Sequence, residues 1–490
     1  MFSKNKKFYV TTSIPYTNAP PHIGFALEIV QADVLARYHK NLGEDIFFLT
    51  GTDEHGLKTL RVAESLGKKP QEFADEISGK FKELAKILNI SNDDFIRTTD
   101  AVKHKPAVEK LWNKLEEKGD IYKKKYKGYY CPGCEAFKTE KEIVDGKCPI
   151  HLKTLELVEE VNYFFRLSKY TKEVEKKIKT GELKIIPDSR KNETLAMLKQ
   201  GMEDVSFSRT KDKYWGWEVP GDPSQVMYVW CDALSNYISA VGYADGPKQF
   251  KKYWPADVHC LGKDIMKFHT IFWPAMLLSA GLKLPKSIFV HGFINVDGQK
   301  MSKSLGNVID PFELVKKYGA DAVRYYLLRE ILPTEDGDFT YAKFEQRYNA
   351  DLAGGVGNLV ARVLGIAKSE ILISKPKIQN KNLELKIREV QKNFKFQISN
   401  FKFNEALSSI WELISFCDKY INEEKLWEAP STPDPKGAWA GKKAKVINDL
   451  FFCIKEIGIL LSPFLPETAE KIEKQVNEQK SEALFPRIIS

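Results

Sequence analysis

Short β-branched and aromatic runs alternate with helical patterns over residues 7–115, and this alternation limits the fold more than any other feature. KKFYVTTSI and DIFFLTGTD are strand-like runs, whereas PQEFADEISGKFKELAKIL has apolar residues at helical spacing. Such alternation is typical of βαβ units, in which helices cross over between parallel strands. Ligands bind to such sheets beyond the carboxyl ends of the strands. We therefore expect an α/β domain with its site at that edge of the sheet.

The alternation is interrupted before the middle of the chain. Cysteine, glycine, proline and clustered lysines break it over residues 118–222, after which strand-like runs resume in SQVMYVWCDAL, ADVHCLGKDI and SIFVHGFINV. We interpret 118–222 as an insertion that splits the α/β domain into 1–117 and 223–295. The next segment, 296–350, contains a glycine-flanked lysine loop.

The last part, 351–490, is expected to be a bundle of α-helices, because strand signals fade there. Its apolar residues recur at helical spacing, and examples are Leu359, Val363, Ile366, Leu407, Ile410, Leu413 and Ile414. Proline and glycine in residues 428–443 predict a loop between two of these helices.

Composition argues against a membrane-spanning protein. The 490 residues are 43% hydrophobic and 29% charged, and no apolar run approaches the roughly 18 residues that a membrane helix needs. The start, MFSKNKKFYV, lacks the apolar segment of a signal peptide, so we expect a cytoplasmic protein. A net charge of +9 permits a polyanionic partner such as nucleic acid, but lysine-rich proteins often have such a charge without one.

Four residues of the expected insertion have the spacing of a zinc site. Cys131-Pro-Gly-Cys134 is followed by Cys148-Pro-Ile-His151. Three thiolates and an imidazole make a closed tetrahedral site with no position left for water, so the zinc would be structural. A cytoplasmic chain does not normally pair such cysteines in disulfides, and the alternative is a set of buried thiols without a metal. The remaining cysteines lack this spacing and are expected in the core: Cys231, Cys260, Cys417 and Cys453.

Two further stretches have residues suited to binding a phosphate chain. His22 and Gly24 precede a helical pattern, and a helix N-terminus presents N–H groups to which phosphate oxygens bind. Gly24 lacks the Cβ that would hold a nucleotide away from the backbone, and His22 can donate a hydrogen bond to phosphate. VDGQKMSKSLGN, residues 296–307, places two lysines in a loop that can close over a triphosphate. Taken alone, each stretch also fits a helix cap or a solvated turn.

Together these two stretches resemble the class I aminoacyl-tRNA synthetases. HIGF and KMSKS stand in the order of that family's HIGH-type and KMSKS elements, which bind ATP on the two halves of a split Rossmann-like fold. The resemblance implies that His22 contacts the phosphates, and that Lys300 and Lys303 stabilise the transition state when an amino acid carboxylate attacks the α-phosphate. No covalent enzyme intermediate is formed, so positioning and electrostatics suffice. Phe25 departs from the family pattern, which usually has a second histidine there, and this raises a question about the rate.

Longer stretches resemble the methionyl-tRNA synthetase family over essentially the whole chain. They are TTSIPYTNAPPHIG, FFLTGTDEHG, YVWCDALSNYISA, GKDIMKFHTIFWPAMLLSAG and HGFINVDGQKMSKSLGN. The resemblance implies that Asp53 binds the ammonium group of methionine. It implies a side-chain pocket lined by Ile14, Tyr16, Trp230, Ala233, Leu234, Tyr237, Phe268, His269 and Trp273. It also implies an ATP site made of His22, Gly24, Lys263, Asp264, His291, Gly292 and Lys303.

Aromatic residues suit a thioether side chain, because sulfur gains about 0.3–1.5 kcal/mol at a ring edge, although any single ring is more often ordinary core. The size of the insertion agrees with this specificity. Discrimination between side chains that differ by one methylene yields only about 1–3 kcal/mol, which forces isoleucine- and valine-type enzymes to have a large editing domain. Residues 118–222 are too few for that domain. The single-knuckle form of the methionyl family has zinc ligands that match Cys131, Cys134, Cys148 and His151.

Three residues of the helical part are candidates for contacts with RNA. Asn358 and Arg362 are four residues apart and so share a helix face, and Trp427 follows a charged stretch. Amide and guanidinium groups read base edges and an indole stacks on unpaired bases, but the residues alone equally fit a capping amide, a surface arginine and a packing tryptophan. The resemblance implies that they recognise the CAU anticodon, which makes 351–490 an anticodon-binding domain and 296–350 the KMSKS loop and stem-contact region.

The reaction implied by the resemblance is activation of L-methionine with ATP and Mg²⁺, followed by transfer to the 3′ end of elongator and initiator tRNA(Met), with one structural Zn²⁺. The sequence shows no additional tRNA-binding or dimerising module after the helical part, so we expect a monomer. Two alternatives stay open. One is a class I synthetase for another hydrophobic amino acid. The other is an RNA-binding protein built on a decayed synthetase, which Phe25 supports and which the intact KMSKS and TGTDEHG argue against.

Overall fold

The computed structural model describes residues 6–133, 136–138, 143–150, 152–301, 306–367, 377–425 and 438–488. The chain divides into two compact units. The first comprises Met1–Pro21, His39–Lys86 and Ile90–His291, and the second comprises His22–Tyr38, Ile87–Asn89 and Gly292–Ser490. Across the described ranges, no helix combines the length and the apolar character that crossing a bilayer requires.

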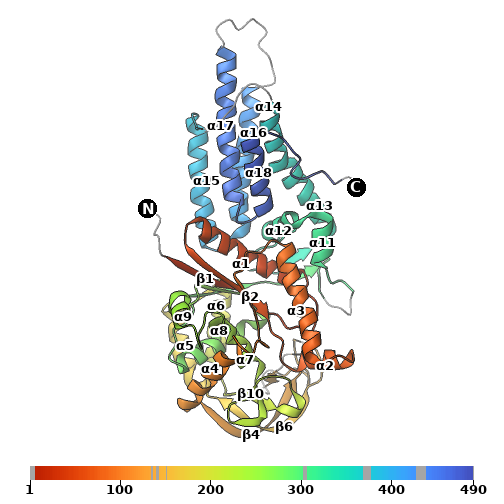
Figure 1. The fold of residues 1–490 in the computed structure, drawn as a ribbon, viewed down its shortest axis with the longest axis vertical. Helices are drawn as coiled ribbons and strands as arrows, with labels where there is room; N and C mark the ends of the chain where they lie inside the picture. Colours follow the sequence, from red (N-terminus) through yellow and green to blue (C-terminus); the bar gives the residue numbers. More distant parts are fainter. Residues whose placement is uncertain are drawn as a thin grey trace. The chain divides into compact units, whose positions relative to one another are not determined.

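A six-stranded sheet forms the centre of the first unit, and Figure 1 shows β1 and β2 side by side within it. In order across the sheet, the strands are β3 (Asp94–Arg97), β2 (Asp45–Thr52), β1 (Lys7–Thr11), β12 (Val258–Gly262), β13 (Ser287–His291) and β7 (Lys184–Ile186). Each strand is parallel to its neighbours, with Tyr9 beside Phe47 and Val10 beside Val258. The predicted α/β class with a parallel sheet is therefore confirmed. The chain order reverses between β1 and β12, and ligands of such sheets bind at that reversal, beyond the carboxyl ends.

Helices pack on this sheet through apolar residues at helical spacing. In α3 (Pro70–Ile87), for example, Phe73, Ile77, Phe81 and Leu84 lie on one buried face. The other helices of this unit are α2 (Leu57–Ser65), α4 (Lys105–Glu117), α5 (Leu167–Lys179), α6 (Asp188–Lys199), α7 (Val229–Leu234), α8 (Asn236–Ser239), α9 (Pro247–Tyr253) and α10 (Trp273–Ser279). Two short helical turns, Lys263–Ile265 and Phe268–Phe272, precede α10.

The segment 118–222, which we expected to be an insertion, contributes to two layers. β7 lies inside it and forms one edge of the main sheet. The rest is largely antiparallel, because β4 (Ile121–Cys131) pairs with β6 (Glu156–Phe165) along almost its whole length. The remaining strands here are β5 (Ala136–Lys138), β8 (Val205–Ser206), β9 (Ser208–Thr210), β10 (Glu218–Val219) and β11 (Asp222–Met227).

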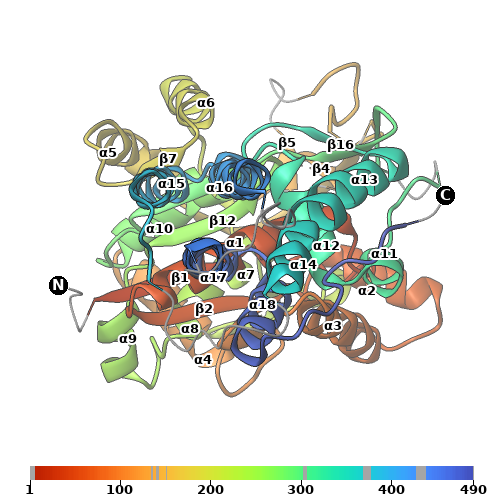
Figure 2. The same ribbon diagram turned by 90° about the horizontal axis from the view of Figure 1, so that it is seen from above.

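The second unit is mainly helical, as predicted for the C-terminal part. Figure 2 shows α15 (Lys381–Ser399), α16 (Phe403–Glu424) and α17 (Ala438–Leu461) nearly end-on; α16 packs against both of the others, and α17 against α18 (Pro466–Glu478). The remaining elements are α1 (Ile23–Asn41), α11 (Pro311–Tyr318), α12 (Ala320–Arg329), α13 (Tyr341–Arg347), a π-helix (Tyr348–Gly357), α14 (Asn358–Ile366), β14 (Ile294–Val296), β15 (Gln299–Lys300) and β16 (Gly337–Phe339). Of the apolar positions predicted to face the bundle core, Leu359, Val363, Leu407, Ile410, Leu413 and Ile414 are buried and Ile366 is half-buried.

A buried ion pair fixes α1 within the second unit. Arg324 of α12 lies 2.7 Å from the carboxylate of Asp33 in α1, and both side chains are fully buried. The same guanidinium donates to the backbone oxygens of Phe464, Pro463 and Leu88. A buried charge pair is tolerated when its remaining donors are satisfied in this way, and removing one partner is costly. The helix that begins with the HIGF motif is therefore firmly joined to the bundle.

Two local predictions were wrong in part. SQVMYVWCDAL is a strand only as far as Met227, and from Val229 it is the short helix α7. The loop predicted for residues 428–443 ends earlier than expected, because α17 begins at Ala438; residues 428–437 lie outside the described part.

Candidate active site

The side chains predicted to bind substrates in the first unit follow the carboxyl ends of its strands. Ile14 and Tyr16 come after β1, Asp53 comes after β2, and Lys263 comes after β12. These three strands include the two at the reversal of chain order. The parallel sheet thus places residues from distant parts of the chain at the edge where a ligand is expected.

Asp53 is held between the segments that leave β1 and β2. Its backbone N–H donates to the oxygen of Pro15 at 2.9 Å, and its backbone oxygen accepts from the N–H of Thr17 at 3.0 Å. Asp53 is only 2% exposed. A carboxylate in so dry a place interacts strongly with a cation that enters beside it.

An aromatic cluster lies in the same unit, and we use this name for Tyr16, Trp230, Tyr237, Phe268, His269 and Trp273. The rings of Trp230 and Phe268 are stacked, with centroids 3.7 Å apart and an angle of 6° between their planes. Trp230 also meets the ring of Tyr16 edge-on at 6.3 Å, and Tyr237 packs against Trp273 at 6.0 Å. Sequence-distant residues that were predicted to line one pocket are therefore in mutual contact.

Hydrogen bonds fix the orientation of His269 in this cluster. Its Nδ1 lies 3.0 Å from the backbone oxygen of Ile265, which can only accept, so Nδ1 carries the hydrogen. In the neutral imidazole Nε2 is then an acceptor, and the hydroxyl of Tyr237 donates to it at 2.7 Å. The tautomer of His269 follows from its two partners, and both rings are locked.

The other predicted lining residues occupy consistent positions. Ala233 and Leu234 are buried on α7, the helix that also contains Trp230, and Ile14 is half-buried. Lys58 was not among the predicted residues, yet its ammonium group lies 4.2 Å from the centre of the Tyr16 ring. A cation at this distance from a ring is attracted to its face.

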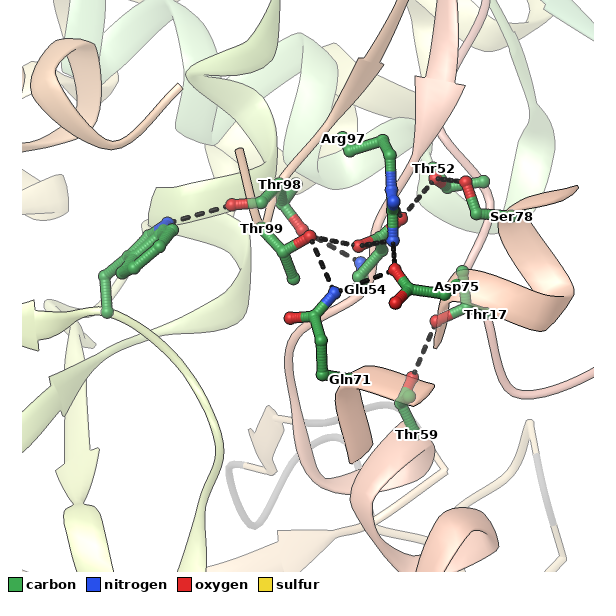
Figure 3. Close-up of polar contacts among 11 residues, drawn as sticks. Thr17, Thr52, Glu54, Thr59, Gln71, Asp75, Ser78, Arg97, Thr98 and Thr99 are labelled. Atoms are coloured by element: carbon green, nitrogen blue, oxygen red, sulfur yellow. Dashed lines mark hydrogen bonds and ion pairs between the residues drawn. The ribbon is translucent and has the colours of Figure 1, made fainter. Parts of the chain in front are cut away.

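Sequence reasoning also missed two polar networks beside Asp53, although one central residue of each, Glu54 or His55, lies in the quoted stretch TGTDEHG. Glu54 accepts from Arg97 at 2.6 and 2.9 Å and from Thr52 at 2.9 Å, and Figure 3 shows these side chains converging on its carboxylate. The backbone N–H of Glu54 donates to Thr98. This network joins the end of β2 to the end of β3.

The second network is a buried His–Asp–His chain. His55 Nδ1 lies 2.6 Å from Asp232 Oδ2, and His104 Nε2 lies 2.9 Å from Asp232 Oδ1. Burial alone would raise the pKa of Asp232, but the two imidazoles more than offset that effect and hold the pKa below its ordinary value. The carboxylate of Asp232 is therefore ionised in the fold.

The predicted ATP ligands of the first unit differ in exposure. Lys263 is half-buried, Asp264 is exposed and His291 is buried at the end of β13. A Cβ on Gly262 would come within 3.0 Å of the Asp264 carboxylate and 3.6 Å of the His291 ring. These side chains therefore gather at the carboxyl end of β12.

In the second unit, the HIGF and KMSKS stretches adjoin despite their separation in sequence. The backbone N–H of Ile23 donates to the oxygen of Ile309 at 3.3 Å, and a Cβ on Gly24 would lie 3.9 Å from the methyl group of Met301. Lys300 is exposed at the end of β15, whereas Lys303 lies outside the described residues. The structure thus brings together the part of the two motifs that it describes.

The start of α1 places His22, Gly24 and Phe25 in different environments. The N–H of Gly24 donates to His22 Nδ1 at 3.0 Å, and a Cβ on Gly24 would come within 2.8 Å of the His22 ring. Glycine at this position leaves room for the imidazole, which is exposed. Phe25 is buried in the first turn of α1, so the residue that departs from the family pattern packs as an apolar side chain.

Gly292 has a backbone reason for being glycine. A Cβ there would lie 2.0 Å from the backbone oxygen of Glu335, so no larger residue fits. The close approach belongs to the junction between the start of β14 and the segment before β16, where Gly337 N–H donates to Phe293. The glycine therefore serves the local fold whether or not it contacts ATP.

Two of the four predicted zinc ligands are described, and they lie in one buried cluster. Cys131 ends β4, and it packs together with Cys148 and Leu155. Within the described part of the chain, neither cysteine forms a disulfide. Among the described residues there is no group of three or more metal-ligating side chains, but Cys134 and His151 lie outside that part of the chain.

The predicted anticodon residues Asn358 and Arg362 lie on α14, as their spacing predicted. Asn358 is exposed. Arg362 donates to Asp418 at 2.7 Å and to Asn422 at 2.8 Å, both on α16. Burial raises the pKa of Asp418, and Arg362 offsets this only in part. Trp427 lies outside the described residues.

Comparison with known families agrees with this geometry. The family model described as "tRNA synthetases class I (M)" matches residues 8–156 and 150–364. A second model, described as "Anticodon-binding domain of tRNA ligase", matches residues 380–487. Together they cover the strands of the main sheet, the KMSKS stretch and most of the helical bundle.

Individual relatives and solved structures extend the match over nearly the whole chain. The methionine–tRNA ligase of Thermotoga maritima is 44% identical over 96% of this chain and 75% of its own length, and that of Caldanaerobacter subterraneus is 45% identical over 96% and 74%. The structure of Mycobacterium tuberculosis methionyl-tRNA synthetase in complex with methionyl-adenylate superposes with a TM-score of 0.90 at 36% identity, covering 98% of this chain and 100% of that one. The apo form of that enzyme gives 0.84 at 34% identity, over 99% of each chain. The parallel sheet, the two adjoining motifs and these matches all agree. The chain belongs to the methionyl-tRNA synthetase family of class I aminoacyl-tRNA synthetases.

Proposed function

We propose that this chain activates L-methionine with ATP and transfers the methionyl group to the 3′-terminal adenosine of tRNA(Met). The observation that carries this proposal is the buried carboxylate of Asp53 beside the aromatic cluster, at the carboxyl ends of β1 and β2. Asp53 would bind the substrate ammonium group. The cluster, with Ile14, Ala233 and Leu234, would enclose the thioether, which gains from contact with ring edges.

The ATP-binding residues of the first unit would be Lys263, Asp264 and His291, and those of the second His22, Gly24, Gly292, Lys300 and Lys303. A carboxylate oxygen of methionine attacks the α-phosphorus, the bond to pyrophosphate breaks, and methionyl-adenylate forms. His22, Lys300 and Lys303 would stabilise the negative charge that develops on the phosphates, and positioned charges of this kind contribute strongly where water is excluded. Mg²⁺ would accompany ATP and neutralise part of its charge. The exposed ends of the His22 and Lys300 side chains suit contact with a polyanion.

One structural zinc ion would be held by Cys131, Cys134, Cys148 and His151. The residues present fit a soft cation, because two of the thiols lie in one buried cluster with apolar neighbours. The metal would supply fold stability to the segment after β4. We expect one zinc per chain by elemental analysis of the purified protein. Protein that contains no metal when purified without chelators would rule out the zinc site.

The bundle would recognise the anticodon of elongator and initiator tRNA(Met) through Asn358, Arg362 and Trp427. Asn358 is exposed on α14, and Arg362 lies one turn further along the same helix. Because its partner is tRNA, the chain would act in the cytoplasm, and we propose that it acts as a monomer. Phe25 packs as a buried side chain in the first turn of α1.

Aminoacylation of transcribed tRNA(Met) tests this function. We expect methionyl-tRNA with the CAU anticodon and little product when the anticodon is changed. The absence of any methionine-dependent product from folded protein would contradict the proposal. Equal charging of both transcripts would contradict the anticodon assignment alone.

A further inference from the structure

The buried His55–Asp232–His104 chain joins three segments that are remote in sequence. His55 belongs to the turn after β2, His104 immediately precedes α4, and Asp232 lies on α7. Asp232 is 177 residues from His55 and 128 from His104. The three side chains are between 0 and 4% exposed, so water does not compete for these bonds.

Two members of this hydrogen-bonded network, His55 and Asp232, stand close in sequence to residues that would bind methionine. Asp53 stands two positions before His55, and Trp230 stands two positions before Asp232. One carboxylate therefore ties the turn that contains the ammonium-binding residue to the short helix that contains the central ring of the aromatic cluster. α7 has only six residues, and its own backbone hydrogen bonds do not connect it to the turn after β2.

The turn is held from both sides. Glu54 faces Arg97 and Thr99, as Figure 3 shows, and so anchors the turn to the end of β3. His55 faces Asp232, and its ring also meets the edges of Trp215 and Trp217 at 4.9 and 5.1 Å. Two neighbouring side chains, Glu54 and His55, thus constrain the backbone on the C-terminal side of Asp53.

We propose that His55, Asp232 and His104 are positioning residues that set the place of Asp53 relative to Trp230, and so the affinity for methionine. The inference rests on the proposed function, because it needs methionine to bind at these residues. None of the three touches the reacting atoms. Their contribution is geometric, and a displacement of about 1 Å in a binding group can cost as much as a hundredfold in rate.

The two histidines use different ring nitrogens, which gives a sharp test. His55 bonds through Nδ1 and His104 through Nε2. The amide nitrogen of asparagine is as many bonds from Cα as Nδ1 of histidine, and that of glutamine as many as Nε2. His55→Asn and His104→Gln keep a donor in place, whereas His55→Gln and His104→Asn misplace it.

Asp232→Asn removes one acceptor, because an amide has a single oxygen for two donors. Asp257→Asn is the matched control in the same unit. Asp257 is also buried and accepts from Lys7 at 2.9 Å and from the N–H of Tyr9 at 2.8 Å, but it stands at the amino end of β12. The control lies at the edge of the sheet opposite to the proposed site.

ATP–pyrophosphate exchange by the full chain, with methionine and ATP varied separately, measures the effect. We expect Asp232→Asn, His55→Gln and His104→Asn to raise the KM for methionine by about tenfold while the KM for ATP stays within about twofold. His55→Asn, His104→Gln and Asp257→Asn should keep both values near those of the unchanged protein.

Several results would overturn the inference. An unchanged KM for methionine in the three disruptive variants would do so, as would equal rises in both KM values or the same response to Asp257→Asn. If Asp232→Asn fails to fold, the opposite behaviour of His55→Asn and His55→Gln still decides the question. Unsubstituted protein that shows no methionine-dependent exchange would instead contradict the proposed function.

Discussion

The aromatic cluster and the HIGF and KMSKS motifs place their side chains in opposite environments. Tyr237, His269 and Trp273 are buried and fixed by stacking and hydrogen bonds. His22 and Lys300, in contrast, are exposed. A neutral thioether offers few directional bonds, so its recognition needs walls whose shape is set in advance. A triphosphate offers charge, and cations that reach it from the surface are sufficient.

The largest effect is expected for Lys300, which is one of the exposed residues. Lys300→Ala should slow methionyl-adenylate formation by about 10²–10³-fold, because a charge that stabilises the transition state is lost. The melting temperature should change little, since Lys300 is exposed at a strand end. Single-turnover adenylate formation measures the rate. The control is Lys392→Ala, an exposed lysine of α15, and an unchanged rate in Lys300→Ala would remove the proposed role.

A smaller effect is expected for Asp53, which is buried. Asp53→Asn should lower kcat/KM for methionine by about a hundredfold, because a charged hydrogen bond to the substrate ammonium becomes a neutral one. Exchange assays with methionine and ATP varied separately measure the change, and the KM for ATP should stay constant. An equal loss towards both substrates would mean that Asp53 supports the fold rather than methionine.

Substitution of Arg362 tests whether the helical bundle, like the HIGF and KMSKS motifs, uses a cationic side chain to bind its substrate. Arg362→Ala should reduce tRNA charging by about tenfold through a lost contact with a base, while adenylate formation stays intact. Asp418→Asn is the control, because it weakens the ion pair and keeps the guanidinium. Similar charging defects in both variants, accompanied by the same loss of thermal stability, would assign Arg362 a purely structural role.

The smallest effect concerns the locking of the aromatic cluster. Tyr237→Phe removes the hydroxyl that donates to His269 and should raise the KM for methionine by about fivefold, which corresponds to the loss of one hydrogen bond. Tyr243→Phe is the control, because the Tyr243 hydroxyl has no hydrogen-bond partner among the described residues. A rise in Tyr243→Phe as large as that in Tyr237→Phe would show that loss of packing, not loss of orientation, is responsible.

Features that depend on short stretches of sequence could be predicted. The alternation over residues 7–115 predicts the parallel sheet, and helical spacing at residues such as Leu407 and Ile410 predicts the bundle. Resemblance selected Asp53 and Trp230, which the structure brings into one unit with Tyr16. Their roles as substrate ligands stay predictions.

Features that depend on contacts between remote residues could not be predicted. The fold brings His55, Asp232 and His104 together from remote parts of the sequence. In the sequence alone, each of them is indistinguishable from an ordinary core or surface residue. The partners of Arg362 lie on α16, so the sequence of α14 could not predict these contacts. The strand β7 is only three residues long, too short for a periodic signal, and it lay inside a segment that we interpreted as an insertion.

The most direct test of the account is ATP–pyrophosphate exchange without tRNA, measured with each proteinogenic amino acid in turn. The account predicts exchange with methionine alone, which would show that the buried cluster selects the thioether and that Phe25 is compatible with catalysis. Exchange supported by a different amino acid, or by none from folded protein, would contradict it.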